Sequence, residues 1–162
     1  MSKPHLPVFF MCVLIIPVLV QAAHWEEVDK EGQYTIAVAV DSIREIADEE
    51  GVVSAWVKRT HPPVTEYPEG VGTYTLMLYH FKCYYRDYGY KSTRLYTATG
   101  EIIHSTETDV VQYQSTTPDS VGGSIFSKVC MSYFVNRAFR KLQACKKRNK
   151  NQTIQEDCLK PD

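Results

Sequence analysis

The segment Thr73–Tyr85 constrains the fold most, because its side chains alternate in character along the chain. Period-two alternation is typical of a β-strand that turns one face toward the core. One of the two alternating sets of side chains becomes polar toward the end of the segment, so we expect the other, more apolar set to face inward. The predicted inward set is Met77, Tyr79, Phe81, Cys83 and Tyr85. This places a cysteine on the buried face of a long strand.

Other segments predict neighbouring strands of the same sheet. Residues 33–40 and 52–60 are rich in β-formers, and the prolines after His61 end the second of these runs. Residues 91–108 predict a hairpin with Gly100 in its turn. A short strand is expected at 110–114, and the acidic stretch that ends at Gly51 predicts a turn or a short irregular helix.

One long helix is expected from Pro118 to about Ala144. Thr117 suits the N-cap, Pro118 suits the first helical position, and basic residues gather in the later turns. An apolar stripe follows the i, i+3, i+4, i+7 spacing of a helix packed on a sheet. Its members are Phe126, Val129, Cys130 and Tyr133.

A second apolar stripe lies nearly opposite the first on this helix and consists of Val135, Ala138, Phe139 and Leu142. A helix packed on a single sheet needs only one stripe. The second stripe could meet a loop, the C-terminal tail folded back by a Cys145–Cys158 bridge, or a second subunit. The last of these predicts a homodimer through the C-terminal helix.

The first residues read as a signal peptide, predicted at 1–22. Lys3 and His5 precede the apolar run Val8–Val20, and Val20-Gln21-Ala22 suits a cleavage site. That run is short for a membrane span, so we expect no membrane span after cleavage. The chain is therefore predicted to be exported, to the periplasm or the cell surface.

Cleavage leaves four cysteines, and an even number in an exported chain indicates disulfides with three alternative pairings. They are Cys83, Cys130, Cys145 and Cys158. A Cys83–Cys130 bridge would fasten the helix to the sheet across the core, and it would leave Cys145–Cys158 to tether the tail. Neither CxxC spacing nor a histidine at zinc-finger spacing is present, so no metal site is predicted.

The composition narrows the class of function. The chain has 162 residues and a net charge of −1, which gives no electrostatic reason to expect nucleic acid as a partner. No GxSxG, HExxH, P-loop or GxGxxG motif occurs, so we predict a non-enzymatic protein without a cofactor. His80 and His104 stand on predicted strands, and haem ligation by them is kept as a rival hypothesis.

The tyrosines near Cys83 supply a candidate contact with a protein partner. Tyr84, Tyr88 and Tyr90 are expected outward or in a turn, close to Arg86. Exposed tyrosine beside arginine is favoured at the hot spots of protein interfaces. An ordinary half-exposed strand surface would explain the same residues.

The order of these features resembles a known family. "YTIAVAVDSI" resembles its early strand, "KCYYRDYGYKSTRLY" its cysteine-bearing strand and hairpin, and the segment Tyr96–Cys130, with "PDSVG" at the helix start, its closing half. From about Trp25 to Leu142 the chain resembles the bacterial surface-adhesin protein E family. It departs from the family in lacking a recognisable lipoprotein signal and in adding Cys145 and Cys158.

The resemblance implies an α+β fold, with a five- or six-stranded antiparallel sheet and one C-terminal helix packed across it. It also implies the Cys83–Cys130 bridge, export, and a domain at 23–144 followed by a tethered tail at 145–162. The implied function is adhesion to host extracellular-matrix proteins. Alternatives are a periplasmic small-ligand or haem binder and a structural component of the envelope.

Overall fold

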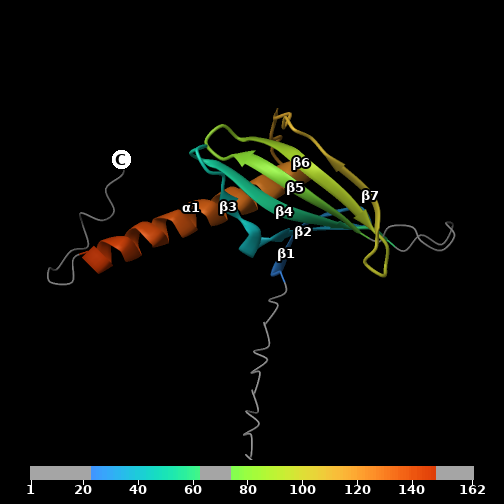
Figure 1. Ribbon diagram of the computed structural model, residues 1–162, viewed down its shortest axis with the longest axis horizontal. Helices are drawn as coiled ribbons and strands as arrows, with labels where there is room; N and C mark the ends of the chain where they lie inside the picture. Colours follow the sequence, from blue (N-terminus) through green and yellow to red (C-terminus); the bar gives the residue numbers. More distant parts are fainter. Residues whose placement is uncertain (1–22, 63–73, 149–162) are drawn as a thin grey trace, which may run out of the picture.

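The computed structural model describes residues 23–62 and 74–148. Within these ranges one antiparallel sheet is crossed by one long helix, α1 (Val121–Arg148), so the predicted α+β fold is confirmed (Figure 1). The main strands, in their order across the sheet, are β1 (Trp25–Glu31), β2 (Tyr34–Ala39), β4 (Val52–Thr60), β5 (Tyr74–Lys82), β6 (Asp87–Tyr96) and β7 (Ile102–Glu107). Shorter elements are η1 (Val40–Ser42), β3 (Arg44–Glu45) beside β4, and β8 (Gln114–Ser115) beside β6.

The pairing of β4 with β5 fixes the two faces of the sheet. Val53 lies opposite Phe81, and Val57 lies opposite Met77, all on the face that α1 covers. Successive side chains of a strand point to opposite faces, so Trp56 and Lys58 lie on the outer face. The predicted inward face of the segment Thr73–Tyr85 is therefore confirmed at Met77, Tyr79, Phe81 and Cys83.

Helix α1 supplies the other half of the core. All four members of the first apolar stripe are buried, and they join Ile36, Val38 and Phe81 in one cluster. Figure 1 shows the sheet in front of the first half of α1, while the later half extends beyond the strands. The first apolar stripe therefore packs against the sheet, and the second apolar stripe lies outside the core.

The start of the helix differs from the prediction. α1 begins at Val121, and the cap is Ser120, whose hydroxyl oxygen accepts a hydrogen bond from the Gly123 amide at 3.0 Å. The same hydroxyl donates to the Thr117 carbonyl at 2.7 Å. Asp119 has φ 54°, in the left-handed region, so a helix cannot run through it from Pro118. The helix also continues past Ala144 to Arg148.

The predicted inward position of Tyr85 is wrong, because its side chain is 75% exposed. β5 ends at Lys82, and the chain then turns: the Tyr85 amide donates to the Lys82 carbonyl at 3.0 Å, and Arg86 has φ 59°. Alternation holds only while the backbone stays extended. The turn therefore releases Tyr85 from the core face.

Two strand predictions also need correction. The strand expected at 110–114 is reduced to β8, which contains only Gln114 and Ser115. In contrast, β1 was not predicted, because its sequence WEEVDKE is rich in charge and poor in β-formers. It forms because it pairs with β2 along the edge of the sheet and because its Glu26 pairs with Lys128 of α1.

A candidate protein-contact surface

The disulfide between Cys83 and Cys130 joins the end of β5 to α1, with the two Cα atoms 5.5 Å apart. The predicted pairing is thus confirmed, and it fixes the chain just before the β5–β6 turn. The Cys83 amide also donates to the Gly51 carbonyl at 3.0 Å. The other predicted bridge involves Cys158, which lies outside the described residues, as do the predicted signal peptide and most of the predicted tail.

Tyr84 follows this clamp and lies across Gly51. A Cβ atom built on Gly51 would overlap the Tyr84 ring, and Gly51 has φ +73°. Only glycine meets both conditions without strain. On its other side the Tyr84 ring contacts Phe134 of α1, with centroids 5.6 Å apart. The aromatic turn is therefore seated between the loop before β4 and the helix.

Arg137 ties these three segments together. Its Nη1 donates to the hydroxyl of Tyr84 at 2.8 Å and to that of Tyr133 at 3.1 Å. Its Nη2 forms an ion pair with Glu50 at 2.8 Å. The hydrogen bond to Glu50, followed by that to Tyr133, raises the pKa of Arg137, which therefore remains charged. One guanidinium thus fixes the turn, the loop and the helix relative to one another.

Glu45 anchors the same network from the side of the loop. Tyr133 donates to Glu45 Oε1 at 2.6 Å, and the Gly51 amide donates to the same oxygen at 3.3 Å. The Tyr133 bond, followed by the Gly51 bond, lowers the pKa of Glu45 despite some opposing desolvation. Burial, together with the bond to Glu45, raises the pKa of Tyr133, so its phenol stays protonated as a donor.

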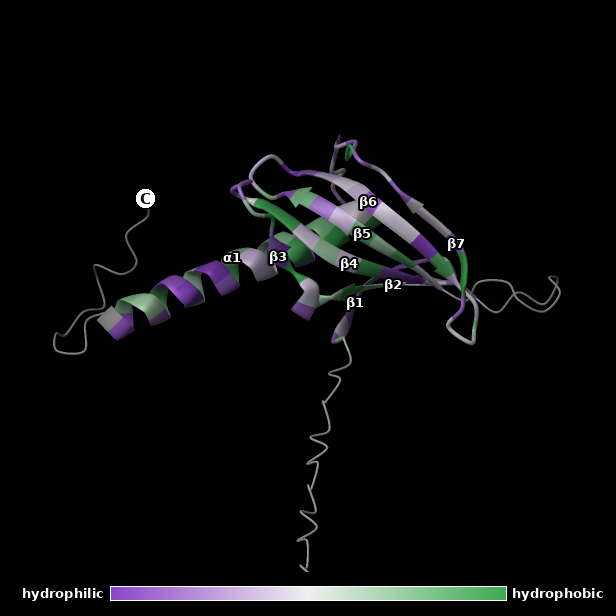
Figure 2. Cartoon of the chain, viewed as in Figure 1, coloured by the Kyte–Doolittle hydropathy of each residue, from purple (hydrophilic) through white to green (hydrophobic). Residues whose placement is uncertain are grey.

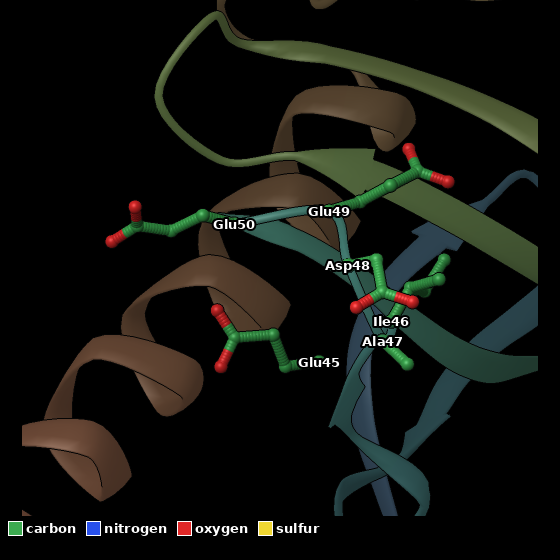
Figure 3. Close-up of a pocket in the computed structure, with 6 residues that line it drawn as sticks. All are labelled: Glu45, Ile46, Ala47, Asp48, Glu49 and Glu50. Carbon is green, nitrogen blue, oxygen red and sulfur yellow. The ribbon is translucent and has the colours of Figure 1, made fainter.

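The loop itself is acidic, and residues 45–50 line a wide, open hollow of about 510 Å³. Figure 3 shows Glu45 and Glu50 on the side of α1, while Glu49 points away from them. The surface formed by this loop, Tyr84, Tyr85, Phe134 and Arg137 is called the tip surface below. It combines exposed aromatic rings with charges that are held in place.

The structure divides the predicted contact residues. Tyr84 and Arg86 lie in the turn, and the Arg86 guanidinium lies 5.7 Å from the Phe126 ring. Tyr88 instead packs: its ring is stacked with Phe81 at 6.4 Å, and a Cβ atom on Gly122 would overlap its hydroxyl. Tyr90 is 58% exposed but lies farther along β6. Of the four, Tyr84 alone belongs to the tip surface.

Several residues of the tip surface were missed from the sequence. Phe134 falls between the two helical stripes, and Arg137 reads as an ordinary basic residue of the later helix. The acidic run before Gly51 was a visible signal, but its position beside Arg137 depends on the fold. Long-range pairs of this kind leave no periodic pattern in the sequence.

The two histidines considered for haem lie far apart. His80 is opposite Gly89 of β6, whereas His104 is opposite Leu95, six residues farther along that strand. At about 3.3 Å per residue the separation is on the order of 20 Å. Burial also lowers the pKa of His80. The pair does not form one site, and within residues 23–62 and 74–148 no cluster of three or more His, Cys, Asp or Glu side chains could hold a metal.

No helix in the described part of the chain is long and apolar enough to cross a membrane.

The described residues define a class of sheet-and-helix protein in which a disulfide fastens the helix to the sheet. The chain belongs to the surface-adhesin protein E family, whose sequence profile matches residues 25–131. Comparison with curated protein sequences gives no significant match.

Solved structures of Haemophilus influenzae protein E resemble this chain. One has 17% sequence identity and a TM-score of 0.50, and the match covers 72% of this chain and 90% of that one. A second crystal form has 14% identity and a TM-score of 0.47, with 70% and 98% covered. The first of these supports the shared fold.

Proposed function

We propose that this protein is a non-enzymatic adhesin, exported to the cell surface, that contacts host extracellular-matrix proteins. Membership of the surface-adhesin protein E family supports the general class. The single observation that carries the proposal is the tip surface, where aromatic side chains remain exposed on a framework fixed by the Cys83–Cys130 bridge and Arg137.

The tip surface has the features expected of a protein-binding hot spot. Tyr84, Tyr85 and Phe134 are 54%, 75% and 38% exposed, which is unusual for side chains of this size in one small area. Tyrosine and arginine are enriched among interface residues that dominate affinity. Because Arg137 and the disulfide already hold the turn in place, binding would lose little conformational entropy there.

The direct test is binding of the purified protein to a panel of immobilised extracellular-matrix proteins, measured by biolayer interferometry. Among the described residues Tyr85 has the most exposed aromatic ring, and Tyr85→Ala removes it while leaving the backbone hydrogen bond of the turn and the Tyr84 contacts in place. We expect at least one matrix protein to bind, and the variant to bind it about 30-fold more weakly, as for a hot-spot residue of about 2 kcal/mol.

Ile103→Ala is the matched control, because Ile103 is also an exposed apolar residue but lies on β7. It should bind like the unaltered protein. Absence of binding to every matrix protein would contradict the adhesin proposal. Binding that Tyr85→Ala leaves unchanged would instead remove the tip surface as its location.

Surface display can be tested separately by protease treatment of intact cells. An adhesin should be lost from intact cells, whereas a periplasmic protein should be degraded only after the outer membrane is opened. Protection in intact cells would therefore favour the periplasmic alternatives over adhesion.

We further propose that the second apolar stripe of α1 forms a contact between two copies of the chain. Val135 and Phe139 are 61% and 57% exposed. Figure 2 shows that the later half of α1 extends beyond the strands. Phe139→Asp should abolish a dimer seen by light scattering, whereas Asn136→Asp, beside the stripe, should not. A monomer at high concentration in the unaltered protein would exclude this contact.

A further inference from the structure

The outer face of the sheet brings together both tryptophans of the chain. Trp25 comes from β1 and Trp56 from β4, and both line one hollow of about 290 Å³. The remaining lining is Ala23, Ala39, Asp41, Ser42, Arg44 and Leu76. In Figure 1 the sheet lies in front of α1, so the viewer faces this outer side. The hollow is thus on the opposite face from the core.

A cation lies over each tryptophan. Lys58 Nζ is 4.6 Å from the Trp25 ring centroid, and Arg94 Cζ is 5.8 Å from that of Trp56. Arg44 also lines the hollow. Among the described residues, none of these three cations forms an ion pair with a carboxylate. The charge of each is therefore available to a partner. Lys58 and Arg94 lie over the tryptophan rings, and Arg44 lines the hollow beside them.

The one carboxylate in the hollow does not balance these charges. Asp41 accepts a hydrogen bond from the His24 amide at 3.3 Å. Glu27, on the neighbouring part of β1, is paired with Lys30 at 3.3 Å. Three cations against Asp41 leave the surroundings of the hollow positive. Its walls, in contrast, are mainly aromatic and aliphatic.

We propose that this hollow, called the tryptophan hollow, is a second binding surface, specific for an extended acidic peptide segment with apolar side chains. An apolar side chain would enter between Trp25 and Trp56, and flanking carboxylates would meet Arg44, Lys58 and Arg94. Arginine recognises carboxylates through its planar fork, and clusters of it commonly recognise acidic motifs. The three cations surround one small hollow with apolar walls, and the net charge of the chain is −1, so the charge pattern favours a short acidic segment over a long polyanion.

The two tryptophans make the test direct, since no other tryptophan contributes to the fluorescence. The purified protein is titrated with an eight-residue peptide of alternating glutamate and leucine. We expect a saturable change in emission that weakens as salt is raised. A peptide of alternating lysine and leucine should give no saturable change, and heparin should bind no better than the acidic peptide.

Arg44→Gln and Arg94→Gln each remove one cation and leave both tryptophans in place. Each variant should bind the acidic peptide roughly two- to five-fold more weakly, the range expected for the loss of one exposed charge pair. Lys82→Gln is the matched control, because Lys82 is a cation that stacks on Tyr113, outside the tryptophan hollow. Thermal melting of all three variants checks that they are folded.

The proposal would be overturned by no saturable change with the acidic peptide, by equal binding of the lysine peptide, or by tighter binding of heparin that the arginine variants weaken. Equal losses in Lys82→Gln and Arg94→Gln would likewise show that only general charge is involved. None of these outcomes bears on the tip surface, because Tyr85 lies in the β5–β6 turn and not in the hollow.

Discussion

Arg137 Nη1 lies 2.8 Å from the hydroxyl of Tyr84, although 53 residues separate the two along the chain. The same guanidinium reaches Glu50 in the acidic loop. The aromatic turn and the loop are therefore positioned by the helix as well as by their own residues, such as Gly51. This relationship explains how exposed rings can be kept in one arrangement at the end of a sheet.

Replacing Arg137 by methionine should loosen the tip surface. The variant keeps most of the aliphatic stem but loses the hydrogen bonds to Tyr84 and Tyr133 and the ion pair with Glu50. We expect a loss of about 1 kcal/mol in urea unfolding, at the low end for bonds to a charged group because the site is partly exposed. Arg140→Met on the next turn should change stability by less than half as much; an equal loss would contradict the special role of Arg137.

A substitution at Gly51 tests how closely the Tyr84 ring packs against the loop. Gly51→Ala places a methyl group where the Tyr84 ring lies and also strains a backbone with φ +73°. Gly32→Ala is a matched control, because Gly32 has φ +60° but nothing within 4 Å of the added carbon. The control should lose about 1 kcal/mol from backbone strain alone. Gly51→Ala should lose clearly more in thermal unfolding, and similar losses would show that Tyr84 adapts freely.

Removing the disulfide should have the largest effect on stability. Cys83 and Cys130 are 47 residues apart, and a crosslink over that span is worth about 4 kcal/mol in the chain-entropy description. Cys83→Ala/Cys130→Ala should lower the urea midpoint accordingly. Reducing agent should destabilise the unaltered protein but have a much smaller effect on this variant; a loss below about 1 kcal/mol would argue against a clamp.

The free energy of unfolding at acidic pH should depend on Glu45. Its pKa is lowered in the folded protein, chiefly by the Tyr133 hydroxyl, so its ionised form stabilises the fold above the ordinary glutamate pKa of about 4.3. That stabilisation is lost as the pH falls through the folded pKa. Glu45→Gln should therefore be less stable than the unaltered protein at pH 7, and the difference should shrink below about pH 4.

A difference between Glu45→Gln and the unaltered protein that stays constant from pH 7 to pH 3 would contradict this role of the carboxylate. Tyr133→Phe is the complementary variant. It removes the donor to Glu45, so the pH dependence attributed to Glu45 should become weaker in urea unfolding followed across the same pH range.

Much of the framework could be predicted from the sequence because it depends on local periodicity. Alternation placed Phe81 of β5 and Cys83, just after that strand, on the inner face, and helical spacing placed Cys130 and Tyr133 on the buried stripe of α1. Those two faces favoured the Cys83–Cys130 pairing, and the structure has it. A residue's face is a local property, set by the backbone period of its own segment.

Only the tertiary structure decided how separate segments meet. Arg86 and Asp119 have left-handed backbone conformations. The turn at Arg86 ends the strand alternation and leaves Tyr85 outward, and Asp119 moves the start of the helix to Val121. Charged β1 became a strand because β2 offered it an edge, and Trp25 thereby came to share a hollow with Trp56. These outcomes depend on contacts between residues far apart in sequence. Such contacts are selected by the packing of the whole chain, and no short stretch of sequence specifies them.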